Sequence, residues 1–191
     1  PSRSMLGTDQ ERWLEDGMRS SKARWNFLVQ QTPMAQSSQL PIAKPGDRRF
    51  WNDGWDGYPS ARTRLFDALS SSGASNPIVL AGDVHTFYAS DLRADFHRPV
   101  SRQNPIVASE FCGTSVTANS RPQSRTQRFV DMNPHIKYGR SDERGFMLFD
   151  VSPAESKVVF LGLDDVRNRD SGAVALAAFR VANGRPGVVR A

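Results

Sequence analysis

Hydrophobic residues recur at helical spacing in two stretches near the start of the chain. A capping-box pattern over residues 8–11 is followed by apolar residues three and four positions apart, which predicts a helix over residues 9–20. A second apolar stripe follows Ser60, a candidate N-cap, and stops at Gly73, so it predicts a helix over residues 60–72. We therefore expect two amphipathic helices in this part of the chain.

Strand patterns occupy the intervals around these helices. Alternation over residues 23–30, broken only by Leu28, predicts a buried strand. The continuous apolar run 77–81 predicts a strand covered on both faces, 106–111 is a further strand candidate, and 125–132 predicts one or two helical turns. The order strand, helix, strand is typical of an α/β layered fold.

The last third of the chain has a different pattern. Residues 145–151, 157–164 and 174–181 are β-rich runs separated by turn residues, which predicts an antiparallel meander after the α/β part. In contrast, residues 31–59 are rich in proline and aromatic side chains and predict a long loop. Loops of this length inside a domain are usually functional or disordered, and the aromatic density favours function.

Composition narrows the possible classes of protein. The chain has 191 residues, 38% hydrophobic and 24% charged, which is enough for a core and unlike a disordered chain. No run approaches the roughly 18 apolar residues of a membrane span. With Cys112 as the single cysteine, any metal has to be held by oxygen or imidazole ligands. The net charge of +5 permits anionic partners without requiring them.

The most specific local feature is Gly82-Asp83-Val84-His85, directly after the predicted strand 77–81. Ligands of open α/β sheets bind at the carboxyl ends of strands. Asp83 and His85, two positions apart after a glycine bend, are therefore candidate metal ligands and catalytic residues. Carboxylate suits calcium, manganese or ferric iron, and imidazole suits zinc or iron. The alternative is that Asp83 caps the following turn and His85 is an ordinary surface histidine.

The aromatic loop supplies a second group of candidates. Trp55 and Tyr58 fit a pocket wall, with Asp53 or Asp56 contacting a metal, a metal-bound water or a neighbouring arginine. Arg62 is a candidate phosphate partner at the start of a helix, and His135 is a candidate for a substrate cleft. The alternative is a tightly wound loop anchored by its aromatic residues, with solvated arginines and a histidine that has no role in binding.

Two further observations bear on chemistry. Glu110 lies on a predicted strand, so its charge needs a partner if it is buried, for example an arginine. The Gly-x-Ser-x-Gly pattern of serine hydrolases and the glycine-rich phosphate loops are absent from the sequence.

Several short motifs follow one another along the chain in the order in which they occur in one known protein family. They are Leu6-Gly7-Thr8-Asp9-Gln10, Arg24-Trp25-Asn26, Asp53-Gly54-Trp55-Asp56-Gly57-Tyr58-Pro59, Gly82-Asp83-Val84-His85 and Arg144-Gly145-Phe146. In these motifs the chain resembles the C-terminal half of the PhoD-like alkaline phosphatases, a branch of the calcineurin-like metallophosphoesterases.

The resemblance carries expectations for fold and function. It implies an α/β fold, namely the C-terminal half of a four-layer β-sandwich flanked by helices, with the β-rich meander at its end. It implies metal-dependent hydrolysis of phosphate mono- and diesters, with calcium and iron as cofactors and Asp83 and His85 among the metal ligands. It also implies export, to the periplasm or outside the cell.

The chain departs from the family pattern because the N-terminal metal motifs do not precede residue 1. We therefore expect residues 1–191 to be one segment, the C-terminal part of the domain, whose partner is the N-terminal half of the same enzyme. Two ligands are too few for a two-metal site, so we expect this chain alone to be inactive.

The alternatives are a non-catalytic half-domain and a module that binds an anion or a partner. Nucleic acid is expected only as a phosphodiester substrate, because Trp51, Trp55 and Tyr58 lie together in the acidic loop and not among the basic residues.

Overall fold

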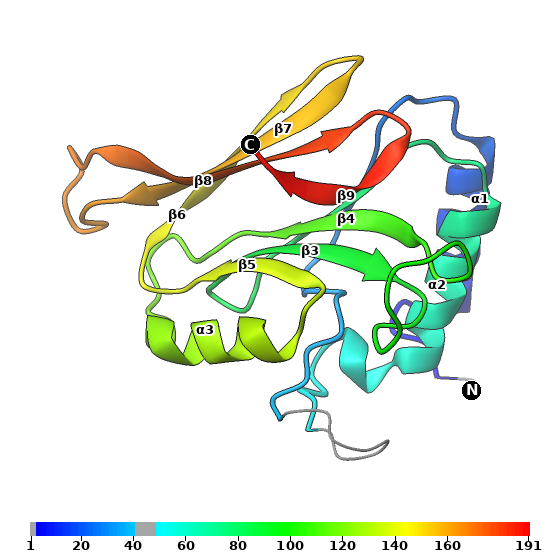
Figure 1. Ribbon diagram of the computed structural model, residues 1–191, viewed down its shortest axis with the longest axis horizontal. Helices are drawn as coiled ribbons and strands as arrows, with labels where there is room; N and C mark the ends of the chain where they lie inside the picture. The colour runs from blue at the N-terminus through cyan, green and yellow to red at the C-terminus, as the bar shows by residue number, and fades with distance from the viewer. Residues whose placement is uncertain (1–2, 41–48) are drawn as a thin grey trace.

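The computed structural model describes residues 3–40 and 49–191, so residues 41–48 of the predicted loop lie outside the described residues. Three helices, α1 (Thr8–Ser20), α2 (Pro59–Ser71) and α3 (Gln123–Met132), lie beside a five-stranded sheet, and a four-stranded sheet lies on the other side (Figure 1). The larger sheet contains, in spatial order, β1 (Asn26–Val29), β2 (Pro77–Ala81), β4 (Ile106–Cys112), β3 (Phe87–Arg93) and β5 (Ile136–Arg140). The smaller sheet contains β6 (Arg144–Val151), β7 (Glu155–Leu163), β8 (Ala173–Ala182) and β9 (Arg185–Arg190).

The strand directions place several chain ends at one edge of the larger sheet. Strands β1, β2 and β4 are parallel, whereas β3 runs antiparallel to both β4 and β5. Cys112 pairs with Ala81 on one side and with Tyr88 on the other. The carboxyl ends of β2 and β4 therefore meet the amino end of β3, and the segment between β2 and β3 lies at this edge.

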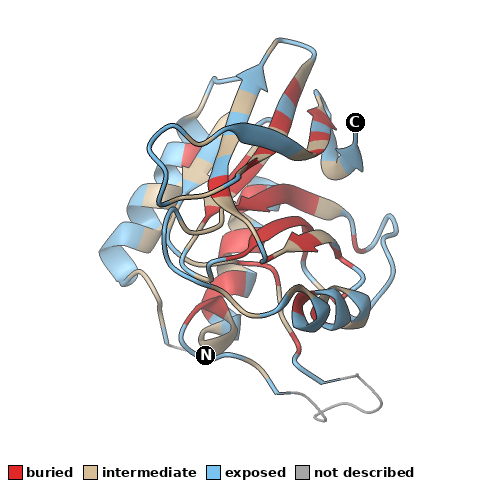
Figure 2. Cartoon of the chain, turned by 90° about the vertical axis from the view of Figure 1, so that its left-hand side faces the viewer, coloured by how far each residue is buried: buried red, intermediate tan, exposed pale blue. Residues whose placement is uncertain are grey.

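Alternating side chains of the larger sheet serve two different cores. Ile78 and Phe111 face the second sheet, where the Phe111 and Phe160 rings meet edge to face with centroids 6.2 Å apart. Val79 and Ala108 pack on the opposite face, in the core formed with α1 and α2. Figure 2 shows the buried residues concentrated in these central strands. The prediction that strand 77–81 is covered on both faces is confirmed.

The first strand differs from its prediction. The predicted buried strand over residues 23–30 is a four-residue strand, β1, at the edge of the sheet. Leu28 packs on the core of α1 and α2, while Phe27 and Val29 are 38% and 73% exposed. The apolar alternation thus indicated a strand, but neither face of β1 is fully buried: Leu28 packs on one core, and the Phe27 ring meets that of Phe149 in the second sheet at 5.9 Å. Neighbouring elements decide how far each side of an edge strand is covered.

The predicted cap of the first helix is wrong. Helix α1 begins at Thr8 after Gly7, whose φ of 84° is left-handed, and no side chain caps it. Glu11, the expected reciprocal partner of the capping box, instead accepts hydrogen bonds from Ser4 and Arg64. A tertiary ion pair has replaced the local capping interaction.

The start of the second helix is also shifted by one residue. Helix α2 begins at Pro59, a residue favoured at the first helical position because it lacks an N–H group, so Ser60 is not the cap. Gly73, with φ 74°, lies just beyond the helix end, as the stop signal predicted.

Three strands have no counterpart in the sequence prediction: β3, β5 and β9. In β3 the whole strand is buried, including Ser90, Asp91 and Arg93. Asp91 is stabilised there by the backbone N–H of Val188 at 2.8 Å and by Lys137 at 3.5 Å. Because the strand contains these polar residues, its sequence lacks the apolar pattern of a core strand. The meander of β6, β7 and β8 is confirmed, and α3, with ten residues, is longer than one or two turns. Among the described residues, no helix is long and apolar enough to span a membrane.

Candidate active site

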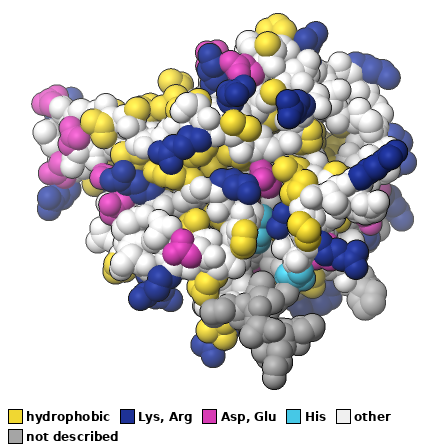
Figure 3. Space-filling model, in the orientation of Figure 1, with side chains coloured by type: hydrophobic (Ala, Val, Ile, Leu, Met, Phe, Trp, Pro, Cys, Tyr) yellow, Lys and Arg dark blue, Asp and Glu magenta, His cyan; other side chains and the backbone are white. Residues whose placement is uncertain are grey.

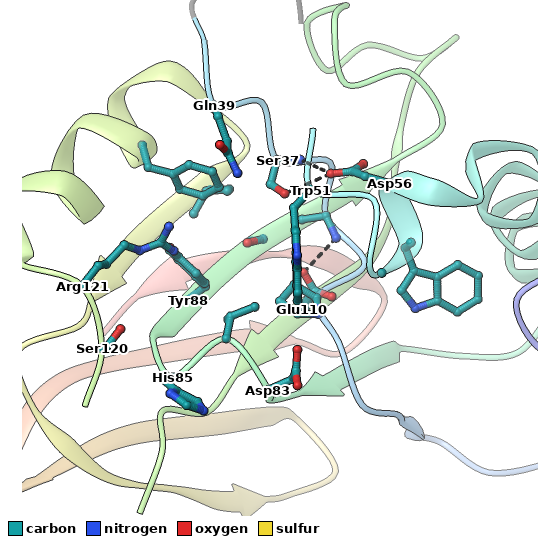
Figure 4. A pocket seen from close by; sticks show the side chains of 18 of the residues that line it. Ser37, Gln39, Trp51, Asp56, Asp83, His85, Tyr88, Glu110, Ser120 and Arg121 are labelled. Atoms are coloured by element: carbon teal, nitrogen blue, oxygen red, sulfur yellow. Dashed lines mark hydrogen bonds between the residues drawn. The ribbon is translucent and has the colours of Figure 1, made fainter. Parts of the chain in front are cut away.

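A pocket of about 530 Å³ opens at the edge of the larger sheet where β2, β3 and β4 meet (Figure 4). Two groups of residues form most of its lining. We call residues 33–39 and 51–56, together with Glu110, the loop wall. We call residues 83–88 and 119–125 the strand-end wall. Asp83 and His85 lie on the strand-end wall, and Trp55 and Asp56 lie on the loop wall.

Asp83 and His85 have an unusual backbone conformation. Their φ angles are 69° and 53°, in the left-handed region that residues other than glycine rarely adopt. Such strain persists only where surrounding structure imposes it, and it is concentrated at functional sites. Among the described residues, no hydrogen bond or ion pair engages the exposed carboxylate of Asp83. Its oxygens are therefore available to a ligand.

The ring of His85 is oriented by the backbone. Its Nδ1 lies 3.1 Å from the carbonyl oxygen of Asn119. Because a carbonyl oxygen only accepts, Nδ1 carries the proton and Nε2 keeps its lone pair in the neutral ring. This arrangement, an imidazole fixed through one nitrogen and open at the other, is the usual preparation of a metal-binding histidine.

The aspartate of the loop wall is fully engaged by protein groups. Asp56 Oδ1 accepts a hydrogen bond from Arg62 Nη1 at 2.6 Å, and Oδ2 accepts from the backbone N–H and the hydroxyl group of Ser37 at 2.9 and 3.0 Å. Both side chains of the ion pair are buried, with 5% and 6% exposed. Of the partners predicted for Asp56, the arginine is the one observed. Arg62 also donates to the carbonyl of Met34 and does not line the pocket, where it was predicted as a substrate residue.

Glu110 lies at the floor of the pocket on β4 and is 1% exposed. Its partners are the backbone N–H groups of Met34, at 2.5 Å, and Ala35, at 3.0 Å, rather than the arginine that the sequence suggested. Burial raises the pKa of Glu110 to about 7, although these two donors act against the rise. The carboxyl group therefore anchors the loop wall to the sheet.

The two aromatic candidates have different positions. Trp55 is almost fully buried, lines the pocket, and donates from its indole N–H to Gln30 Oε1 at 2.9 Å. Tyr58 is not part of the lining, and its ring is covered by the guanidinium of Arg3 at 4.7 Å. Trp55 therefore has the predicted place in a pocket wall, whereas Tyr58 lies behind it.

His135, the other predicted cleft residue, lies outside the pocket lining. It is 3% exposed, its Nε2 donates to the carbonyl of Gln36 at 2.6 Å, and its ring contacts that of Phe96. Burial lowers its pKa to about 4, so the ring is neutral at physiological pH. His135 supports the loop wall from behind and is too enclosed to meet a substrate in this conformation.

The described ranges 3–40 and 49–191 supply only part of the donor set that a metal site needs. There, no three His, Cys, Asp or Glu side chains come together as one metal-binding group. Asp83 and His85 offer one carboxylate and one imidazole at the same pocket, and the nearby Cys112 is buried with its thiol donating to the carbonyl of Gly82. Two donors suit a shared site better than a complete one.

A family model described as PhoD-like phosphatase matches residues 1–160 of the chain. The chain belongs to the PhoD-like phosphatase family. Alkaline phosphatase D of Bacillus subtilis (strain 168) is 37% identical over 160 residues, which are 82% of this chain and 26% of that protein. A solved structure described as "Structure of PhoD" matches with a TM-score of 0.85 and 32% identity, over 100% of this chain and 36% of that one.

These matches confirm the resemblance to PhoD-like alkaline phosphatases that the sequence motifs indicated, and they place the chain in a phosphatase family. The structural match confirms a mixed α/β fold with two sheets. The family match ends within β7, whereas the structural match continues through β8 and β9, so the second sheet belongs to the shared fold. The chain spans about a quarter of the curated relative.

Several pocket residues of this PhoD-like phosphatase chain were missed by sequence reasoning. They come from the polar segment 119–125 and from the unpredicted strand β3. They are Tyr88, Asn119, Ser120, Arg121 and Arg125. The only sequence signal was the basic character of that segment, which is more typical of a solvated surface.

Proposed function

We propose that the protein containing this chain hydrolyses phosphate mono- and diesters with the help of metal ions, calcium and iron being the expected pair. Family membership supports a phosphatase. The observation that carries the proposal is the pair Asp83 and His85, held in left-handed backbone conformations on the wall of a 530 Å³ pocket with a free carboxylate and an open imidazole nitrogen. Residues other than glycine adopt this conformation uncommonly, and such positions are concentrated at functional sites.

The donor chemistry agrees with this assignment. The carboxylate of Asp83 is a hard ligand that suits calcium or ferric iron, and the imidazole of His85 suits iron. Metal ions in such a site polarise phosphoryl oxygens and lower the pKa of water. The chain itself contributes orientation, because the carbonyl of Asn119 fixes the His85 ring. The hydrogen-bonded loop wall encloses the opposite side.

Two donors are too few, so we infer that an N-terminal half of the same enzyme completes the site and the four-layer sandwich. The edge strand β1 offers Phe27 and Val29 to solvent, and Trp13 on the neighbouring helix is 72% exposed. An exposed apolar strand edge is a natural place for another segment to pack. Export to the periplasm or cell exterior is part of the same proposal, by analogy with the family.

The test compares His85→Ala with His97→Ala, an exposed histidine outside the pocket, in the full-length protein encoded by the gene. We expect His85→Ala to reduce turnover of a phosphomonoester and a phosphodiester at least about a hundredfold, because metal contributes several kcal/mol to such reactions. Elemental analysis is expected to show reduced metal content in His85→Ala alone. Near-normal turnover and metal content in His85→Ala would contradict the proposal.

A second candidate is a non-catalytic half-domain that binds an anion or a partner. The absence of a three-donor metal group among the described residues favours it. The distribution of charged side chains is relevant to whether the partner is a nucleic acid, because nucleic-acid binding usually requires a basic patch or stripe. On the face seen in Figure 3, Lys and Arg side chains are scattered among acidic and uncharged ones instead of forming one basic stripe. Full-length protein that binds phosphate but has no turnover with any added metal would favour this candidate.

A further inference from the structure

Among the described residues, two arginines line the active-site pocket, Arg121 and Arg125, and of these Arg121 has an aromatic platform. Its Nη2 donates a hydrogen bond to the hydroxyl group of Tyr88. Its guanidinium carbon lies 5.1 Å from the centre of the Phe129 ring and 5.8 Å from that of Tyr88. Tyr88 and Phe129 are themselves buried, and the centroids of their rings are 5.7 Å apart, so they form a rigid support. The guanidinium plane is therefore held in one orientation.

The positive charge of Arg121 is not neutralised. Among the residues described, no carboxylate forms an ion pair with it, and its buried Nε has no hydrogen-bond partner. Its hydrogen-bond acceptor, Tyr88, is uncharged, because burial raises the pKa of the phenol to about 12. Arg62, by contrast, is already paired with Asp56. A held guanidinium with unused donors favours an anionic ligand.

Arg121 is tied to the candidate metal ligands by its own chain neighbours. The carbonyl of Asn119 accepts from His85, and the hydroxyl of Ser120 lies 3.0 Å from that of Thr86. Segment 119–121 therefore follows the loop of Asp83 and His85 closely. Figure 4 shows Arg121 and Tyr88 on the same side of the pocket as His85, with Glu110 and Asp56 across from them.

We propose that Arg121 binds the phosphate group of the substrate, holding its non-bridging oxygens in the forked guanidinium while Asp83 and His85 serve the metal. The inference rests on the proposed function, because it assigns a further residue of the same pocket. Arg125, exposed and also in the lining, lies four positions further, in the first turn of α3, and adds positive charge to the pocket. Phe129 and Tyr88 act as positioning residues, since they fix the plane of the fork.

The experiment uses the full-length protein with its metals and inorganic phosphate as the probe. Arg121→Gln removes the charge, Arg121→Lys keeps the charge without the fork, and Arg128→Gln on the exposed part of α3 is the control. We expect the inhibition constant of phosphate and the KM of a phosphomonoester to rise about ten- to hundredfold in Arg121→Gln. Arg121→Lys is expected to fall between Arg121→Gln and the wild type, and the control to match the wild type.

A milder variant guards against a folding defect. Tyr88→Phe keeps the ring under the guanidinium and removes only the hydroxyl acceptor, so we expect about a fivefold weaker phosphate affinity with unchanged metal content. Unchanged phosphate inhibition in Arg121→Gln would overturn the assignment of Arg121 while leaving the proposed function standing. A fall in metal content or thermal stability with unchanged phosphate affinity would mean a structural role and would also overturn it. A wild type that neither binds phosphate nor hydrolyses esters would overturn both proposals.

Discussion

The two walls of the pocket contain similar residue types in opposite states. On the loop wall, Asp56 and Glu110 have their hydrogen-bonding capacity used by Arg62, by Ser37 and by backbone N–H groups. On the strand-end wall, Asp83 makes no such bonds among the described residues, and Arg121 has no ion pair there. Charged groups that are paired internally hold the protein together, whereas unpaired ones at a pocket are free to bind a ligand.

This contrast separates stability from function. Changes in the loop wall are expected to affect folding first and activity only as a consequence, because they break buried pairs. Changes at Asp83, His85 and Arg121 of the strand-end wall are expected to affect binding and turnover with little loss of stability, because these side chains are exposed or partly exposed and have few partners.

The largest expected effect on stability comes from breaking the buried ion pair. Arg62→Met leaves the carboxylate of Asp56 buried with only Ser37 as donor, and we expect the free energy of unfolding to fall by about 3–5 kcal/mol. Arg64→Met, two positions along the same helix, removes a much more exposed pair with Glu11 and is expected to cost far less. Urea denaturation of both variants tests the difference; equal losses would show that burial of the Arg62 pair is unimportant.

The raised pKa of Glu110 predicts a pH dependence. Its pKa is about 7 in the folded protein against an ordinary 4.5, so between these values the folded chain holds a proton that the unfolded chain has released. Stability should therefore fall as the pH rises from about 4.5 to 7, by up to about 3 kcal/mol. Glu110→Gln should lose this slope, and Glu15→Gln on α1 should keep it. An identical slope in Glu110→Gln, measured by urea denaturation at several pH values, would contradict the assignment.

His135 predicts a pH dependence of opposite sign. Its pKa is about 4 against an ordinary 6.5, so the unfolded chain binds a proton that the buried ring does not. Stability should fall as the pH is lowered from about 6.5 towards 4. His135→Asn is expected to lose less stability than the wild type when the pH is lowered from about 6.5 to about 4. His97→Asn is expected to behave like the wild type. Acid titration followed by circular dichroism measures this shift, and its absence would place the His135 ring in contact with water.

The smallest expected effect on stability tests the contrast between the two walls most directly. Asp83→Gly relieves the left-handed strain and removes a side chain without protein partners, so we expect stability to rise by about 0.5 kcal/mol while turnover is lost. Asn76→Gly is the matched control. Asn76 has φ 48°, but its side chain bonds Arg24, Asn183 and Gly184, so its removal should destabilise. A clear loss of stability in Asp83→Gly would mean that Asp83 has a structural role.

Much of the fold could be predicted from local patterns. The helices and the strands β2, β4, β6, β7 and β8 have apolar periodicities strong enough to reveal them. Strand β3 could not be found, because it contains Ser90, Asp91 and Arg93, and the partners of buried Asp91, Val188 and Lys137, lie far away in the chain. The same reason explains the partial exposure of β1, which depends on what lies beside the sheet edge.

The candidate site divides in a similar way. The pair Asp83 and His85 was visible because a glycine bend after an apolar run is a local signal. Arg62 and His135 lie outside the pocket lining, because Arg62 pairs with Asp56, six positions earlier, and His135 bonds to Gln36, 99 positions earlier. Arg121 was missed because its meaning depends on Tyr88, a partner 33 positions earlier.

By itself, the sequence determined the helices, most strands, the family and the tetrapeptide that ends β2, because each of these depends on residues adjacent in the chain. Only the tertiary structure decided which charges are satisfied. Whether a carboxylate or guanidinium is paired depends on groups brought together by strand pairing and helix packing, and this distinction separates Asp56 and Arg62 from Asp83 and Arg121.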